Sequence, residues 1–183
     1  HVVGVFHRQG IHTSRFGRSP DGRLYVAVNR EWHGFHPVFI YERVAGGQYK
    51  LRTRIEPIFT DKPDRRGRPQ KTQTGARVWS DANDDQQEQP GEVRDYDIEL
   101  GMWLAGWYMP MTPTMIFYGG DYRIAPTGWT ACGAPLYDLS QAARLPAPDE
   151  SAGRRGVGMG VSRSCGSADG RIVLAFNGEI LGP

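Results

Sequence analysis

Glycine and proline recur along the whole of this chain, and they limit the length of the regular elements it can form. The sequence holds 24 glycines and 13 prolines among 183 residues. Both residue types disfavour helix interiors and are common in turns. The sequence therefore predicts many turns, short strands and few long helices, which makes an all-β architecture the expected fold class.

The length and composition fit one globular domain. Hydrophobic residues make up 39% of the chain and charged residues 23%, and no apolar stretch approaches the ~18 residues that a membrane span needs. We expect residues 1–183 to form a single β-rich domain with an inserted loop from about 56 to 93. A β-sandwich with this loop is one architecture that explains the strands.

The most specific chemical pattern lies in residues 81–92, which read DANDDQQEQPGE. Acidic or amide side chains stand at the first, third, fifth, seventh, ninth and twelfth positions, which is the spacing of an EF-hand calcium loop. Oxygens at these positions can surround a calcium ion, with a bidentate Glu closing the shell. The predicted ligands are Asp81, Asn83, Asp85, Gln87 and Glu92.

A plain surface loop is the alternative interpretation of the same residues. The sixth position, where the template uses Gly for a sharp turn, is Gln86. A polar run that ends in Pro90-Gly91 is also typical of a solvated loop. The preceding residues, TQTGARVW, favour a strand, so a calcium ion here would stabilise a β-rich domain and not a helix-loop-helix sensor.

A second pattern is a repeat. Residues 19–26 read SPDGRLYV and residues 167–174 read SADGRIVL, 148 residues further on. Each copy combines an Asp-Gly turn with an apolar-rich segment that favours a strand. A propeller blade takes ~40–50 residues, so this spacing corresponds to about three blades.

These segments resemble β-propeller proteins whose blades open with an SPDGRLYV-type strand, and secreted propellers with EF-hand-like loops between blade strands. Residues 78–93, 128–130 and 133–138 share the resemblance. It implies a partial propeller, because a closed one needs about four to eight blades. The missing blades would come from the same polypeptide, from a second copy or from another chain. The implied function is a secreted, calcium-stabilised module with a binding or structural role.

An enzyme is the alternative function. His1, His33 and His36 could bind a metal, and a free N-terminal His1 could hold copper, a resemblance to lytic polysaccharide monooxygenases that is confined to this one residue. A propeller-based redox or hydrolytic subunit is a further form of this alternative. No nucleophile elbow, P-loop or haem-attachment motif occurs, so the sequence assigns no catalytic residue.

Aromatic residues and the cysteines complete the candidates. Exposed rings could form a carbohydrate or peptide platform, although large aromatics in β-rich proteins usually lie in the core. The platform candidates are Trp103, Trp107, Tyr108 and Trp129. Cys132 and Cys165 could form a disulfide in an oxidising compartment, and with a chain that starts at His1 they favour an extracellular or periplasmic location.

Nucleic acid is not an expected partner. The net charge is only +2, and the basic run over residues 62–71 contains no aromatic residue on which a base could stack. This run favours an exposed, flexible loop because it also holds two prolines and a glycine.

Overall fold

The computed structural model describes residues 13–29, 37–63, 66–98, 100, 111–119, 122–144, 163–166 and 173–176. Within these ranges the regular elements are strands and three short 3-10 helices, which confirms the all-β class. The strands are β1 (Thr13–Arg18), β2 (Leu24–Asn29), β3 (Val38–Arg43), β4 (Tyr49–Pro63), β5 (Pro69–Ser80), β6 (Val93–Tyr96), β7 (Phe117–Gly119), β8 (Tyr122–Ile124), β9 (Gly128–Trp129), β10 (Pro135–Leu136), β11 (Ala143–Arg144), β12 (Arg163–Gly166) and β13 (Val173–Phe176). The 3-10 helices are η1 (Ala45–Gly47), η2 (Pro90–Glu92) and η3 (Leu139–Gln141).

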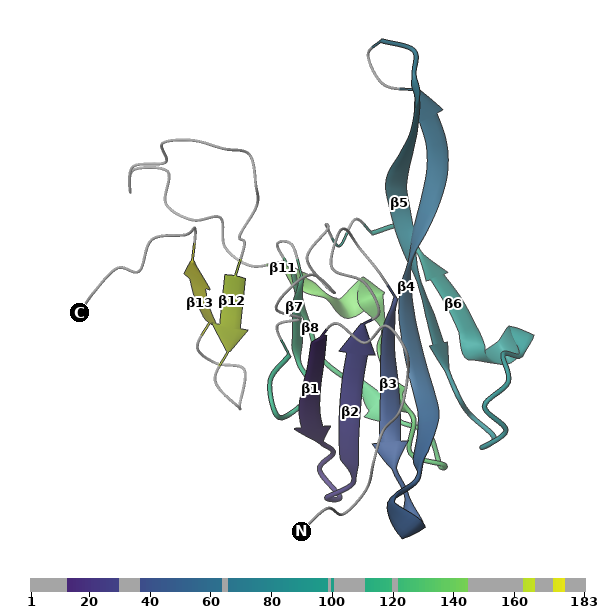
Figure 1. Ribbon diagram of the computed structural model, residues 1–183, viewed down its shortest axis with the longest axis vertical. Coiled ribbons are helices and arrows are strands. Elements are labelled where there is room, and N and C mark those ends of the chain that lie inside the picture. Colours follow the sequence, from purple (N-terminus) through teal and green to yellow (C-terminus); the bar gives the residue numbers. More distant parts are fainter. Residues whose placement is uncertain are drawn as a thin grey trace, which may run out of the picture.

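An antiparallel six-stranded sheet dominates the fold, with its strands in the order β1-β2-β3-β4-β5-β6 (Figure 1). Each strand is paired with its neighbour in sequence, so short turns suffice to connect most of them. The β1–β2 turn runs through Gly22, whose φ of 91° is a left-handed conformation that glycine adopts without strain. The sheet is therefore a simple meander.

The central strands bury apolar side chains on both faces of this sheet. Successive side chains of a strand point to opposite faces, so Tyr25 and Ala27 share one face while Val26 and Val28 share the other. All four are buried. Antiparallel sheets commonly leave one face to solvent, so burial of both marks β2 and β3 as an inner layer of the molecule.

A second layer of short strands covers the first of these faces. It consists of the three-stranded sheet β11-β8-β7 and the hairpin β9-β10. Phe117 and Ile124 from this layer join Tyr25, Ile40 and Ile55 of the large sheet in one hydrophobic core. The ring of Tyr137 meets Phe117 edge-on in the same core, with 5.6 Å between the ring centroids.

Propeller blades are not confirmed among the described strands, which form one six-stranded meander and smaller sheets but no closed ring. The described strands on either side of the two SxDGR segments nevertheless pair antiparallel, β1 with β2 and β12 with β13. Their registers differ by one residue, since Arg15 pairs with Ala27 but Arg163 pairs with Phe176. Within the described residues, no helix is long and apolar enough to cross a membrane.

The long inserted loop expected from about 56 to 93 is corrected by the structure. Residues 56–63 belong to β4 and residues 69–80 to β5, and the two strands pair as far as Pro63 and Pro69. The loop signals in the sequence, which are Pro, Gly and charge, concentrate at the end of this hairpin. The Thr- and Gln-containing stretches that flank the signals pair as strands. Among the described residues of this range, 66–68 lie in the turn of the hairpin and 81–89 form an irregular loop before η2.

Candidate functional site

The acidic residues 81–92 connect β5 to β6 at the edge of the large sheet. Asp81 continues the line of β5 into the interior, where its backbone N–H donates to the carbonyl of Arg52 at 2.9 Å and its side chain is fully buried. The residues from Ala82 to Gly91 are exposed. The chain then returns through η2, and Val93 pairs with Trp79. The loop thus leaves the sheet at the end of β5 and returns to it at the start of β6, so its two ends lie side by side.

Its backbone bends sharply at two places. Asp84 has a φ of 71° and Gln86 a φ of 59°, which are left-handed conformations that side chains with a Cβ seldom adopt. Gln86 is the sixth position of the window, where the calcium template uses Gly. The side chain of Gln86 offsets part of this strain, because its Oε1 accepts a hydrogen bond from the backbone N–H of Leu51 at 3.2 Å.

Side chains of the loop hold the bends in place. The N–H of Asp84 donates to Asp81 Oδ1 at 2.8 Å, and the N–H of Gln87 donates to Asp85 Oδ1 at 2.8 Å. Asn83 Nδ2 donates to Asp85 Oδ2 at 3.1 Å. Short polar side chains bonded to the backbone two or three residues on are a common way to stabilise such turns.

The structure brings some of the predicted calcium ligands together and separates others. Asn83 and Asp85 are in contact, and Glu92 folds back to the start of the loop, where its Oε1 accepts from the N–H of Ala82 at 2.7 Å and its Oε2 from Trp79 Nε1 at 3.0 Å. Asp81 turns inward instead. Within the described residues, no group of three or more His, Cys, Asp or Glu side chains is gathered closely enough to hold a metal ion.

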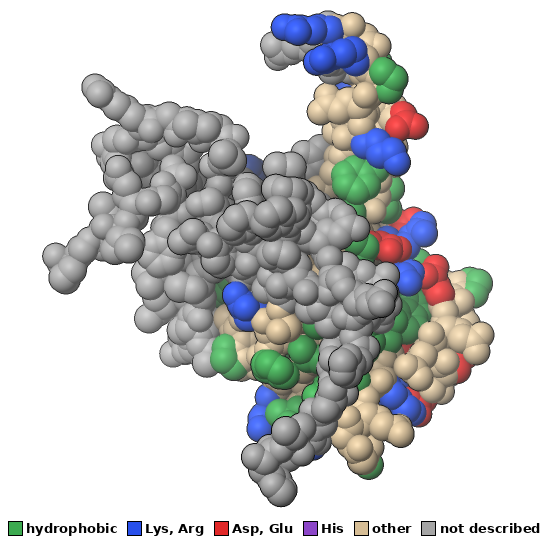
Figure 2. Space-filling view, viewed as in Figure 1, with side chains coloured by type: hydrophobic (Ala, Val, Ile, Leu, Met, Phe, Trp, Pro, Cys, Tyr) green, Lys and Arg blue, Asp and Glu red, His purple; other side chains and the backbone are tan. Residues whose placement is uncertain are grey.

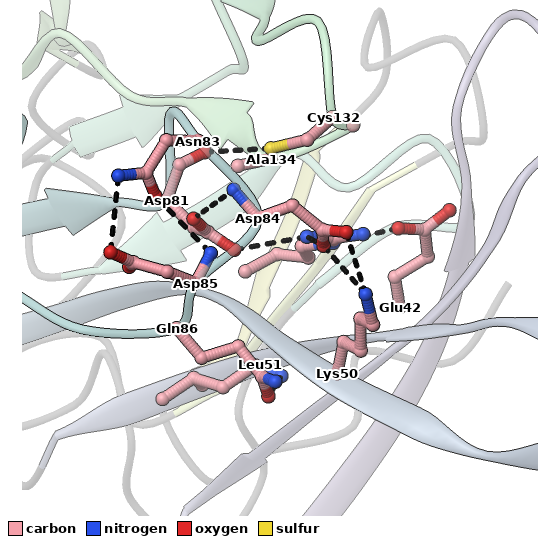
Figure 3. A network of polar contacts seen from close by, with 12 residues as sticks. Glu42, Lys50, Leu51, Asp81, Asn83, Asp84, Asp85, Gln86, Cys132 and Ala134 are labelled. Atoms are coloured by element: carbon pink, nitrogen blue, oxygen red, sulfur yellow. Dashed lines mark hydrogen bonds and ion pairs between the residues drawn. The ribbon is translucent and has the colours of Figure 1, made fainter.

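Asp81 turns inward because Arg52 binds it. Arg52 is almost fully buried and donates from Nη1 to Asp81 Oδ2 at 2.9 Å and to Asp84 Oδ1 at 2.5 Å, and from Nε to Glu42 Oε2 at 2.7 Å (Figure 3). Burial by itself lowers the pKa of Arg52, but these three carboxylates outweigh it and raise the pKa. The ion pairs with Lys50 and Arg52 lower the pKa of Asp84. Ion pairs between the loop carboxylates and the cations of β4 therefore hold the loop against the sheet.

Sequence reasoning missed Arg52, and a bulge explains why. The register of β3 and β4 shifts between Ile40 and Tyr41, which pair with Thr53 and Leu51, so Arg52 is the extra residue of a β-bulge. Bulges re-aim side chains, and here the bulge aims a cation at the acidic loop. Neither Arg52 nor Glu42 belongs to a motif that could have identified it, and Arg52 does not stand out in its own strand, where Lys50 and Arg54 are charged as well.

The same charges connect the loop to the first SxDGR copy. Arg23 donates from Nη1 to Glu42 Oε1 at 3.3 Å and to the carbonyl of Cys132 at 3.0 Å, while its Nε binds Asp21 Oδ2 at 2.9 Å. Ser19 Oγ accepts from the N–H of Arg23 at 3.0 Å and shapes the turn. The SxDGR residues thus form a turn that directs its arginine into the buried network.

The turn between β9 and β10 packs against the start of the acidic loop. The Oγ1 of Thr130 donates to the carbonyl of Asp81 at 3.0 Å, and Cys132 Sγ lies 3.1 Å from the same oxygen. Cys132 is a free thiol here, and the side chain of Cys165 lies outside the described residues, so their disulfide stays a prediction. Trp129 is half-buried and its ring centroid lies 5.3 Å from that of Tyr25, which makes it part of the core margin.

The other site candidates fall outside the described residues. These are the metal candidates His1, His33 and His36 and the platform residues Trp103, Trp107 and Tyr108. The copper and platform hypotheses therefore stay predictions.

A small hollow of about 170 Å³ lies beside the loop, between β6 and the β9–β10 hairpin. Glu92, Tyr96 and Leu136 are among its lining residues. Two of the hydroxyl groups at its wall are already engaged, since Ser80 and Thr130 donate to backbone carbonyls. The acidic loop, with its specific spacing and shape, is the stronger candidate site.

No protein family, curated protein or solved structure matches this chain. The fold and the site define it as an all-β protein with an acidic loop anchored on a buried arginine.

Proposed function

We propose that this chain is a calcium-stabilised, β-rich module with a binding or structural role in a larger extracellular or periplasmic assembly. The observation that carries the proposal is the conformation of Gln86 in the acidic loop. At this sixth position the chain takes a left-handed conformation, with a φ of 59°, although the residue is not Gly. Gln86 is the one residue that departs from the calcium template, and its backbone nevertheless has the left-handed conformation that suits the sharp turn of the template.

The donor set fits calcium in its chemistry. Asp81, Asn83, Asp85 and Glu92 offer the side-chain oxygens that this hard cation prefers, and Gln87 offers its backbone carbonyl. When bound, the ion would neutralise carboxylates that now depend on hydrogen bonds within the loop. An ionised carboxylate has about four acceptor positions, so the bonds that Asp81 makes to Arg52 and Asp84 leave room for a further ligand contact.

Arg52 sets an expectation for the affinity. Its positive charge lies 2.9 Å from Asp81 Oδ2, so it opposes a second cation at this carboxylate. We therefore expect weak binding, in the range of about 10⁻⁴–10⁻³ M that is found in extracellular calcium modules. Such an affinity suits a site that is filled where calcium is abundant and that stabilises structure.

The role in a larger assembly is supported by the repeat of the SxDGR segments, because their spacing corresponds to about three blades and a closed propeller needs about four to eight. Val26, Val28, Phe39 and Tyr41 form an apolar cluster on the face opposite the main core, and this chain already buries them. Further blades from this polypeptide, from a second copy or from another chain would be the partners.

The test is thermal unfolding with and without calcium. If Kd is about 1 mM, 10 mM calcium stabilises the folded state by about 1.4 kcal/mol, which raises Tm by about 3–6 °C. The same concentration of magnesium should give a smaller shift, because magnesium demands a stricter octahedral geometry. The variant Glu92→Gln should lose most of the calcium-dependent shift.

Glu88→Gln is the matched control. It makes the same chemical change four residues earlier in the loop, at a position that supplies no ligand and where the carboxylate pairs with Arg54. This variant should keep the full calcium shift. Equal shifts in Glu92→Gln and Glu88→Gln, or no shift in the unmodified chain, would refute the calcium site.

A further inference from the structure

The hairpin of β4 and β5 extends far beyond the sheet to which it belongs. Pairing of β3 with β4 ends at Ile55, and pairing of β6 with β5 ends at Ala76. Residues 56–63 and 69–75 continue as a two-stranded ribbon, here called the arm, which no third strand flanks among the described residues. At about 3.3 Å per residue, its eight-residue first strand is about 26 Å long. Figure 1 shows the arm projecting from the molecule.

Such a ribbon has no core of its own. Isolated two-stranded hairpins are marginally stable in water, so a long one that is retained on the surface suggests a contact function. Three prolines, Pro57, Pro63 and Pro69, lie in its strands and remove backbone donors from its edges. The arm is thus poorly suited to adding a strand from a partner, and its side chains are left to make the contact.

These side chains are mainly cationic toward the tip. Lys62, Arg66, Arg68 and Lys71 are exposed there, against a single described acid, Asp61. Figure 2 shows the blue Lys and Arg side chains gathered at this end of the molecule. By sequence, residues 61–71 carry five basic and two acidic side chains, a net charge of +3, whereas the whole chain carries +2. The net positive charge of residues 61–71, here called the arm tip, therefore exceeds that of the whole chain.

The cations surround the tip and do not form one flat face. Asp61 pairs with Lys71, and the next pair along the ribbon is Lys62 with Gln70. Neighbouring pairs point to opposite faces, so the two lysines lie on opposite sides. A flexible anionic polymer can follow charges placed in this way, whereas a protein interface needs a packed centre, commonly with Trp or Tyr anchors.

Two other occupants fit less well. The acidic loop of a second copy has the opposite charge, but three of its acids are already paired, Asp81 and Asp84 with Arg52 and Glu88 with Arg54. Single-stranded nucleic acid needs aromatic rings on which bases can stack, and residues 60–72 contain none.

We propose that the arm tip is a binding site for an acidic polysaccharide, with its lysines and arginines pairing with sulfate or carboxylate groups along the polymer. The contact is electrostatic and is weakened by salt. It does not involve the acidic loop, so it holds whether or not that loop binds calcium.

The test is binding of the full chain to heparin, a sulfated polysaccharide, and to polygalacturonate, a carboxylated one, across a salt series. The double variant Lys62→Gln/Lys71→Gln should weaken binding about tenfold and lower the slope of log Kd against log salt by about two, one unit for each lost ion contact. Its Tm should not change, because both side chains are exposed.

Arg94→Gln/Arg123→Gln is the control, since it removes the same charge from β6 and β8, away from the arm. It should bind as the unmodified chain does. Equal weakening in both double variants would mean non-specific attraction and would overturn the proposal. Tighter binding to duplex DNA than to either polysaccharide at the same salt, or salt-sensitive self-association without polysaccharide binding, would overturn it as well.

Discussion

At the scale of single residues, Arg52 connects the two most distinctive sequence patterns of this protein. It binds Glu42, which also binds Arg23 of the SxDGR turn, and it binds Asp81 and Asp84 of the acidic loop. A buried charge is costly unless it is paired. The buried carboxylates therefore depend on the positive charge of Arg52, and a substitution of Arg52 tests this dependence.

We expect Arg52→Met to lower the free energy of unfolding by about 3–5 kcal/mol, because it leaves Asp81 and Glu42 buried without their main counter-charge. Urea unfolding in the presence of a chelator measures this. Arg94→Met, at an exposed position of β6, is the control and should change stability by less than about 0.5 kcal/mol. A loss below about 1 kcal/mol in Arg52→Met would show that the network does not hold the loop.

Residue patterns alone could locate the loop but not its anchoring. The spacing of Asp81, Asn83, Asp85 and Glu92 is local information, and the sequence contains it in full. That Arg52 reaches Asp81 depends on a bulge in β4 and on the pairing of β4 with β5, which are set by contacts distant in the chain. Whether Gln86 could adopt a left-handed backbone likewise depended on its bond to Leu51.

At the scale of elements, Gly75 marks the point where the sheet ends and the arm begins. A Cβ atom added there would lie 2.6 Å from the carbonyl oxygen of Tyr96, the last residue of β6. This distance is shorter than real Cβ contacts allow. The atom in the way belongs to the backbone, which cannot move without distorting the edge of the sheet. The glycine thus permits β6 to end close against β5.

Gly75→Ala should therefore lower the free energy of unfolding by about 1–3 kcal/mol through overpacking. Gly91→Ala is the matched control, since nothing lies within 4 Å of its added Cβ, and it should change stability by less than about 0.5 kcal/mol. Urea unfolding of both variants makes the comparison. An equal effect of the two substitutions would mean that β6 can shift to make room at Gly75.

The elements differ in how far the sequence predicted them. The apolar residues of the segments 37–41 (PVFIY) and 49–55 (YKLRTRI) favour strands, and β3 and β4 lie there. The arm was missed because Pro63, Gly67 and Pro69 are usual loop residues, whereas here Pro63 and Pro69 form the last pair of the two strands and Gly67 lies in the turn between them. Local signals could not show that Thr60 and Thr72 face each other across the ribbon.

At the scale of the whole molecule, side-chain hydroxyl groups of the large sheet hold the second layer in place, because they donate hydrogen bonds to its backbone carbonyls. Thr53 Oγ1 and Ser80 Oγ both donate to the carbonyl of Pro135, at 2.8 and 3.0 Å, and Tyr25 OH donates to the carbonyl of Gly133 at 2.6 Å. Burial raises the pKa of Tyr25, so its hydroxyl stays protonated and can donate. No sequence pattern could reveal these contacts, because they join residues 55 to 108 positions apart.

Tyr25→Phe tests whether the β9–β10 hairpin can open while the sheet stays folded. The change keeps the ring that meets Trp129 but removes a buried hydrogen bond, which costs about 1–2 kcal/mol. We expect the amide of Gly133, which bonds to Thr130, to exchange with solvent about 5–30 times faster. The amides that pair β2 with β3 should keep their rates, because their strands lie within the sheet. Tyr96→Phe removes a longer hydrogen bond, 3.4 Å from the Tyr96 hydroxyl to the carbonyl of Tyr137, and should leave both regions unchanged. Equal acceleration of the hairpin and of β2 in Tyr25→Phe would instead mean that the two layers unfold as one cooperative unit.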